Sequence, residues 1–208
     1  MSAMKVLLIN PSSLEDAPRM ERAECRYDPP LAAIYLGSCL KEKGIECDIT
    51  DTLIDEIDIG KIRDGEYGLI SFTVFIGNFL KNARDLSTLI KKTRPDIPIV
   101  FGGVMASIFP DLILKEYPID FIIRYEGENS LSELVEYLEG KRQIYEINGL
   151  SYKSGDRIIH NPPRYLEKNL DAFPVPDWSL LGPKCNKKQI PYYFSIITSR
   201  GCPYRCRF

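Results

Sequence analysis

The sequence predicts an α/β protein with a doubly wound, Rossmann-like parallel sheet of five strands, followed by a β-hairpin and a proline-rich connector. Two observations carry this prediction. Apolar runs alternate with helical patterns five times between residues 5 and 140, which is typical of strand–helix–strand units in a parallel sheet. The runs are also nearly continuous in apolar character, as expected when helices cover both faces of the sheet.

The expected strands are five short apolar runs, each ending at turn-forming or small polar residues. They cover residues 5–10, 45–51, 67–74, 97–101 and 119–124. The first run ends at Pro11 and the fourth at Gly102, residue types that favour a turn after a strand.

The expected helices follow these strands. They cover residues 30–43, 55–63, 79–90, 110–117 and 130–140. Gly44 is placed to stop the first helix, and apolar residues from Phe79 to Ile90 recur at spacings of four, three and four, which is one face of an amphipathic helix. Ser130 and Glu133 have the spacing of a capping box, which predicts that the last helix starts at Ser130.

After Gly140 the pattern changes. Residues 147–152 and 157–160 flank a turn and predict a hairpin, and residues 192–198 predict a further strand. Prolines between them exclude a long helix; they are Pro162, Pro163, Pro174, Pro176, Pro183 and Pro191. We therefore expect three parts, residues 1–142, 143–191 and 192–208.

Composition narrows the class of protein. With 44% hydrophobic and 27% charged residues the chain is globular, and its net charge of −2 provides no basic field for nucleic acid. No apolar run approaches the roughly 20 residues of a membrane-spanning helix. Six irregularly spaced cysteines do not form the framework of a secreted disulfide protein, so a cytoplasmic location is expected, without nucleic-acid or membrane partners.

Ligands of a parallel α/β sheet bind at the carboxyl ends of its strands. The loops expected there are residues 10–13, 51–52, 73–77, 102–107 and 125–129, and four of the five contain glycine or small hydroxyl residues that let a large ligand approach the backbone. For any single loop, a turn requirement explains the glycine equally well. The first strand is not followed by Gly-x-Gly-x-x-Gly, so a dinucleotide site is not expected.

Cys202 and Cys206 form a candidate metal site. They lie four residues apart after a predicted strand, and Arg200, Arg205 and Arg207 favour their thiolate forms. Thiolates select iron–sulfur clusters or zinc, although two unrelated cysteines are the simpler explanation of a bare Cys-x-x-x-Cys. Cys25, Cys39 and Cys47 lack metal-ligand spacing and are expected to pack in the fold, and Cys185 has no assigned role.

Residues 202–208 resemble the first seven positions of the radical S-adenosylmethionine signature, Cys-x-x-x-Cys-x-aromatic-Cys. Further motifs resemble the N-terminal cobalamin-binding domain, with connector, of cobalamin-dependent radical S-adenosylmethionine proteins. They are Asn10-Pro11, Pro29-Pro30-Leu31, Gly102-Gly103, Glu126-Gly127-Glu128 and Asn148-Gly149-Leu150. The resemblance spans the whole chain, and it implies that the sequence stops within the Cys-x-x-x-Cys-x-x-Cys motif.

This resemblance implies a corrinoid whose nucleotide tail lies beside the third and fourth strands. The residues it assigns to the cofactor are Asn10, Pro11, Ser12, Ser71, Thr73, Val74, Gly102, Gly103, Glu126, Gly127 and Glu128. The loop of residues 10–15 stands where many cobalamin proteins have Asp-x-His-x-x-Gly, but Ser12 occupies the place of the cobalt-ligating histidine. Met105 replaces the histidine of the Gly-Gly-Pro-His found in many relatives.

The resemblance also implies an activity. The three parts become a cobalamin-binding domain, a connector, and the first strand and cluster loop of a radical S-adenosylmethionine barrel that continues in the same chain. In the full-length protein Cys202 and Cys206 would be ligands of a 4Fe-4S cluster that cleaves S-adenosylmethionine, and methylcobalamin would donate a methyl group to an unactivated carbon of a small-molecule or natural-product substrate. With two of three cluster cysteines, this chain alone is expected to be inactive.

Three alternatives remain. The same fold without cobalamin could dock a substrate or the barrel, which the missing histidines favour. A methylthiotransferase arrangement would require cysteines in the loops after the strands, and those loops have none. A zinc site at Cys202 and Cys206 would need two further ligands.

Overall fold

A computed structural model describes residues 4–12, 29–182, 195–201, 204 and 206. Five neighbouring strands of its sheet are parallel, in the order β2-β1-β3-β4-β5, which confirms the predicted doubly wound topology. Their bounds are β1 Val6–Asn10, β2 Cys47–Asp51, β3 Leu69–Thr73, β4 Ile99–Gly102 and β5 Phe121–Ile123. The strand order reverses between β1 and β3, so ligand-binding loops are expected near these strands.

The hairpin belongs to the same sheet. Strands β6 (Leu150–Ser154) and β7 (Arg157–His160) are antiparallel and extend the sheet to seven strands, with Ile123 of β5 paired with Leu150 of β6. The sequence predicted the hairpin but not its pairing. That pairing satisfies the backbone N–H and C=O groups on the free side of β5, which would otherwise form an exposed sheet edge.

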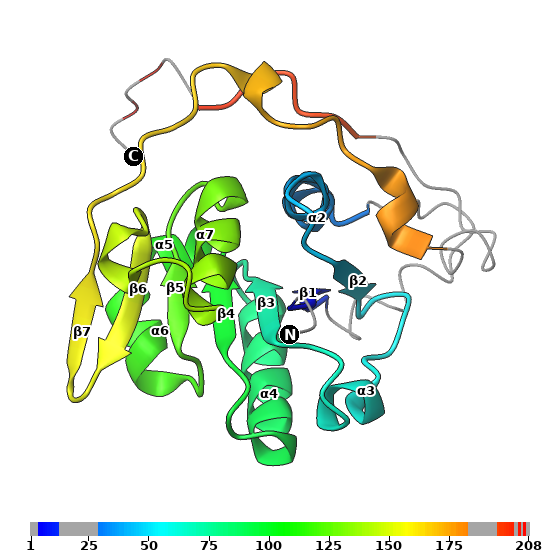
Figure 1. Cartoon of the computed structure of the whole chain (residues 1–208), viewed down its shortest axis with the longest axis vertical. Helices are drawn as coiled ribbons and strands as arrows, with labels where there is room; N and C mark the ends of the chain where they lie inside the picture. Colours follow the sequence, from blue (N-terminus) through cyan, green and yellow to red (C-terminus); the bar gives the residue numbers. More distant parts are fainter. Residues whose placement is uncertain (1–3, 13–28, 183–194, 202–203, 205, 207–208) are drawn as a thin grey trace.

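Helices cover both faces of the sheet (Figure 1). One face carries α3 (Ile59–Arg63), α4 (Asn78–Thr93), α5 (Val104–Ile108) and α6 (Pro110–Glu116). The other carries α2 (Leu31–Glu42) and α7 (Glu128–Leu138). Side chains alternate along the strands, so Phe72 and Phe101 meet edge to face on the first side while Leu8 and Val100 pack on the second. Helix α5 was not predicted, because five residues are too few to produce a helical period.

The predicted capping box is wrong. Helix α7 begins at Glu128, so Ser130 and Glu133 lie inside it. Both side chains bind Arg164 of the connector: its Nε donates to Ser130 Oγ at 2.8 Å, and its Nη2 forms an ion pair with Glu133. The two side chains therefore bind Arg164, which is distant in the sequence, and do not cap the helix.

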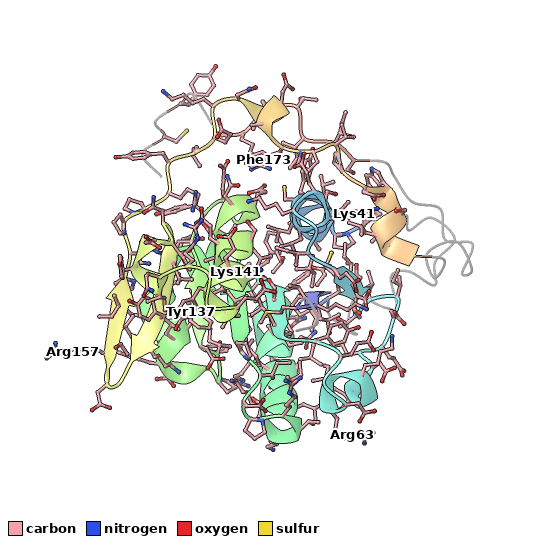
Figure 2. All side chains as sticks on the ribbon, in the orientation of Figure 1. Lys41, Arg63, Tyr137, Lys141, Arg157 and Phe173 are labelled. Atoms are coloured by element: carbon pink, nitrogen blue, oxygen red, sulfur yellow. The ribbon has the colours of Figure 1, made fainter. Side chains whose placement is uncertain are left out.

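The described part of the connector packs against helices of the domain. From β7 it passes over α7 and α2 to the turns η3 (Leu170–Ala172) and η4 (Trp178–Leu181) (Figure 1), while η2 (Ile144–Glu146) precedes β6. At η4 the Asp177 N–H donates to Ser38 Oγ at 2.8 Å and Lys41 Nζ lies 2.6 Å from Asp177 Oδ2, an ion pair on α2 (Figure 2). The prolines therefore shape a segment that packs on the sheet's helices.

The predicted strand of residues 192–198 is not formed in its described part. Residues 195–200 have neither strand nor helix structure, and residues 192–194 lie outside the described part of the chain. A strand requires a neighbouring strand in a sheet, and residues 195–200 are not part of the sheet formed by the described residues. Within the described ranges, no helix combines the length and apolarity needed to cross a membrane.

Candidate cofactor site

A cavity of about 230 Å³ lies at the carboxyl ends of β3, β4 and β5, between α2 and α7. Ser71 and Thr73 of β3 and Val100 and Gly102 of β4 line it. Because residues two apart in a strand point to the same face, these pairs form a floor on the α2–α7 side of the sheet. The floor combines two hydroxyl groups with a position that has no side chain.

The two adjacent glycines have different roles. A Cβ added to Gly102 would meet no atom closer than 3.8 Å, so the position tolerates a side chain, which would project on the cavity side as Val100 does. Gly103 has φ +95°, and a Cβ there would lie 2.7 Å from the carbonyl oxygen of Val74. Gly102 therefore leaves space in the cavity, whereas Gly103 allows two strand ends to approach.

Val74 has a structural role and does not contact the cavity. It is fully buried, and its N–H donates to the Gly102 carbonyl at 2.8 Å. This hydrogen bond continues the pairing of β3 and β4 beyond their last strand residues. Val74 thus fixes the positions of the residues that form the floor.

The loop after β5 forms the rim. Tyr125 has a left-handed backbone, with φ +65°, and its side chain is 61% exposed. Glu126 and Glu128 follow it on the cavity wall with Gly127 between them, and their side chains are only 12% and 8% exposed. Glu126 Oε2 accepts from the Glu167 N–H at 2.9 Å, while its buried Oε1 has no hydrogen bond among the described residues.

Arg200 forms ion pairs with both carboxylates. Its Nη1 lies 3.1 Å from Glu126 Oε1 in an ion pair that lacks hydrogen-bond alignment, and its Nη2 donates to Glu128 Oε1. Burial alone would lower the pKa of the guanidinium, but the hydrogen bond to Glu128 and the negative charges of Glu128 and Glu126 raise its pKa above the ordinary value. Ile197 and Arg200 also line the cavity.

The sequence did not identify Arg200, Tyr35 or Ile197 as part of the cavity wall. Tyr35 of α2 lines the cavity opposite the rim, and its ring faces Arg200 at 5.7 Å. One signal could have found Arg200: residues 178–208 contain no acidic residue, although residues 1–177 carry an excess of acidic over basic residues. In a chain that is otherwise acidic, such a basic segment is a candidate ion-pair partner for two closely spaced glutamates.

The loop after β1 lies apart from the cavity. Asn10 Nδ2 donates to Ser12 Oγ at 3.0 Å, and Ser12 Oγ donates to Asp51 Oδ1 at 2.8 Å. Asn10, Pro11 and Ser12 are not among the lining residues, so the structure does not bring them together with Ser71, Thr73 and Gly102. Their polar groups bind one another and the end of β2.

The cysteines divide by exposure. Cys206 is exposed and Cys202 lies outside the described residues. Cys39 is buried and Cys47 half-buried, and burial raises the pKa of their thiols to about 12 and about 11, which agrees with a packing role. Cys25 and Cys185 are outside the described ranges. Within those ranges, no three His, Cys, Asp or Glu side chains gather as a metal site.

Comparison with known proteins identifies the domain. The family model described as "B12 binding domain" matches residues 26–135. The whole chain is 32% identical to an uncharacterized methyltransferase of Pyrococcus horikoshii and covers 45% of that protein. Over 99% of its length it is 26% identical to the anaerobic magnesium-protoporphyrin IX monomethyl ester cyclase of Synechocystis sp., of which it covers 42%. The chain thus spans less than half the length of these relatives.

A solved structure has the same fold. The cobalamin-dependent S-adenosylmethionine radical enzyme OxsB, with aqua-cobalamin bound, superposes with a TM-score of 0.73 at 24% identity, over 89% of this chain and 25% of OxsB. The family match covers more than half of the chain and contains the cavity residues from Ala32 to Leu131. The chain therefore belongs to the B12-binding domain family.

Proposed function

We propose that this chain is the cobalamin-binding domain of a radical S-adenosylmethionine enzyme, and that the whole enzyme is a methyltransferase acting on an unactivated carbon. The observation that carries the proposal is the cavity beside β3 and β4, where Ser71, Thr73 and the side-chain-free Gly102 form the floor within the matched range. Methylcobalamin, when bound, supplies the methyl group. The chain's own residues bind and orient the cofactor and exclude water.

The cavity suits the nucleotide tail of the cofactor. Its apolar wall, from Leu36, Val100, Ile123 and Leu131, fits a flat aromatic base, and its volume accommodates such a base but not a corrin ring. The hydroxyl groups of Ser71 and Thr73 on the floor offer acceptors to the amide and hydroxyl donors of the tail.

The corrin ring would lie outside the cavity, against apolar side chains at the carboxyl edge of the sheet. Phe75 and Ile76 after β3, Val104 and Ile108 of α5, and Tyr125 after β5 are large and exposed. Exposed apolar side chains grouped beside a pocket are typical of a binding surface.

No histidine of this chain is placed to hold cobalt. His160, the only histidine in the sequence, lies on β7, where its Nδ1 is 2.8 Å from Ser151 Oγ and its Nε2 is 3.4 Å from Asp111 Oδ1. Met105, at the position where many relatives have histidine, packs partly buried against the core. We therefore expect bound cobalamin without a histidine ligand.

In the full-length enzyme, Cys202 and Cys206 would bind a 4Fe-4S cluster that cleaves S-adenosylmethionine. The barrel that completes this site would follow in the same chain, and the enzyme would work in the cytoplasm. The methyltransferase relative supports methyl transfer. The cyclase relative supports ring formation as the second candidate reaction. Iron analysis of the reconstituted full-length protein tests the cluster, because Cys206→Ser should remove it.

Cofactor binding is tested on the 208-residue chain. After incubation with hydroxocobalamin and gel filtration, the wild type should retain about one equivalent, measured by its corrinoid absorption spectrum. Gly102→Leu should lose the cofactor while its circular dichroism spectrum stays unchanged, since the new side chain occupies the cavity. Thr73→Val should weaken binding, whereas the matched Thr88→Val on the exposed face of α4 should not. Absence of binding to the wild type at micromolar cobalamin would refute the proposal.

A further inference from the structure

Arg200 connects the C-terminal segment (residues 195–201) to the rim of the cavity. Its guanidinium faces Glu126 and Glu128, and the three side chains are 17%, 12% and 8% exposed. Arg200 has a planar fork of donors that can serve two carboxylates at once, a geometry that lysine cannot reproduce. In such a buried setting neither carboxylate can lose its cation without leaving an uncompensated charge.

Two aromatic rings complete the surroundings of Arg200. The ring centroid of Tyr35, on α2, lies 5.7 Å from its guanidinium carbon, and that of Phe173, on the connector, lies 5.1 Å away. Both distances are within the range of cation–π attraction. One side chain thus meets α2, the connector, the loop after β5 and the start of α7.

A second contact holds the same segment. The Tyr35 hydroxyl lies 3.5 Å from the Ile197 carbonyl oxygen and 3.4 Å from the Ile197 nitrogen. Ile197 and Arg200 both line the cavity, and about 230 Å³ of space remains beneath them. The C-terminal segment is therefore a wall of the cavity and does not fill it.

The same segment leads directly to the candidate cluster cysteines. Arg200 is followed by Gly201, with φ +81°, and then by Cys202 in the sequence. The residue that closes the corrinoid cavity is thus two positions from the first candidate cluster ligand. A shift of Arg200 would change the cavity wall and the position of Gly201 together.

From this geometry we infer that Arg200 is a positioning residue that couples occupation of the corrinoid cavity to the order of the C-terminal segment (residues 195–201), which leads into Cys202 in the sequence. The inference rests on the proposed function. Coupling between two sites is reciprocal: if the ordered C-terminal segment strengthens cofactor binding, the bound cofactor must order the segment. Both directions can be measured on the 208-residue chain.

The test combines hydrogen exchange with cofactor release. In the wild type, hydroxocobalamin should slow amide exchange of residues 195–201, followed by mass spectrometry. In Arg200→Gln, these amides should exchange faster without cofactor, the cofactor should no longer slow them, and cobalamin should dissociate about tenfold faster. Arg200→Lys should lie between the wild type and Arg200→Gln, because lysine retains the positive charge but lacks the planar set of guanidinium donors.

Arg164→Gln is the matched control. Arg164 pairs with Glu133 in a similarly buried ion pair on α7, with side chains 19% and 17% exposed, but it does not line the cavity. The variant should leave the exchange of residues 195–201 and the release of cobalamin unchanged. If Arg200→Gln does not fold, adding Glu126→Gln and Glu128→Gln removes the stranded carboxylates, and the faster exchange should persist.

The outcomes separate the inference from the proposed function. If the wild type binds cobalamin and Arg200→Gln matches it in both release rate and exchange, the coupling is refuted while the proposed function stands. If the wild type binds no cobalamin, both are refuted. A tenfold faster release confined to the Arg200 variants, with the Arg164 control unchanged, supports the coupling.

Discussion

Gly103 and Val74 approach so closely that a Cβ on Gly103 would lie 2.7 Å from the Val74 carbonyl oxygen. Gly103 also has φ +95°, where a side chain strains the backbone. We expect Gly103→Ala to lower the free energy of unfolding by about 2 kcal/mol. Gly102→Ala is the control, because its Cβ has ordinary contacts, and it should stay within about 0.5 kcal/mol of the wild type in urea denaturation.

The left-handed backbone of Tyr125 should make the fold less stable than it would be with glycine at this position. Its φ of +65° is the left-handed conformation, yet its N–H donates to Ser107 Oγ at 2.8 Å and holds the loop in place. Tyr125→Gly should raise the free energy of unfolding by about 1 kcal/mol, since glycine adopts this conformation without strain. Tyr125→Ala keeps the strain and should show no gain. An unchanged or lower midpoint of thermal unfolding for Tyr125→Gly would contradict this explanation.

Thiol alkylation should separate the cysteines. At pH 8 iodoacetamide should modify the exposed Cys206 and spare Cys39 and Cys47, whose pKa values burial raises to about 12 and about 11. Cys39 and Cys47 should both react after unfolding in urea, and peptide mapping by mass spectrometry checks each site. Because their folded-state pKa values exceed the roughly 8.5 of a free thiol, they favour the folded state fully below that pH and less as the pH rises toward 11.

The attachment of η4 to α2 should weaken in acid. Hydrogen bonds from Lys41, and then from Ser179, lower the pKa of Asp177 to about 2. Since an unfolded aspartate has a pKa of about 3.9, this carboxylate favours the attached state above that pH, and the effect is lost as the pH falls toward 2. The fluorescence of Trp178, the only tryptophan, should report the transition.

A charge deletion checks this interpretation of the Asp177 titration. Lys41→Met should move the Trp178 transition toward pH 4, because it removes the largest cause of the lowered pKa. Lys43→Met is the control: Lys43 lies on the same side of the sheet and bonds Ser132 at 2.6 Å, with no contact to Asp177. Equal shifts in both variants would show that overall charge, not this ion pair, sets the transition.

The sequence predicted the five parallel strands because each is a buried apolar run whose character does not depend on distant partners. The sequence-based prediction failed for side chains whose role depends on a residue far away in the sequence. Ser130 could not be recognised as a ligand of Arg164, since the two residues are 34 positions apart. Ser12 is held by Asp51 in the same way. Ser71, Thr73 and Gly102 were assigned to the cofactor only by the family resemblance; strand alternation explains why they lie together on the floor, whereas the wall formed by Arg200 depends on tertiary packing.

The course of the connector has a mechanical consequence. It is fastened to the domain at Arg164 on α7, at Asp177 on α2 and, in the returning segment, at Arg200 on the rim. Of these three contacts, only Arg200 lies next to Gly201, the last residue of the described segment. The direction in which the chain reaches Gly201 therefore depends on Arg200, and the contacts at Arg164 and Asp177 hold only the earlier part of the connector.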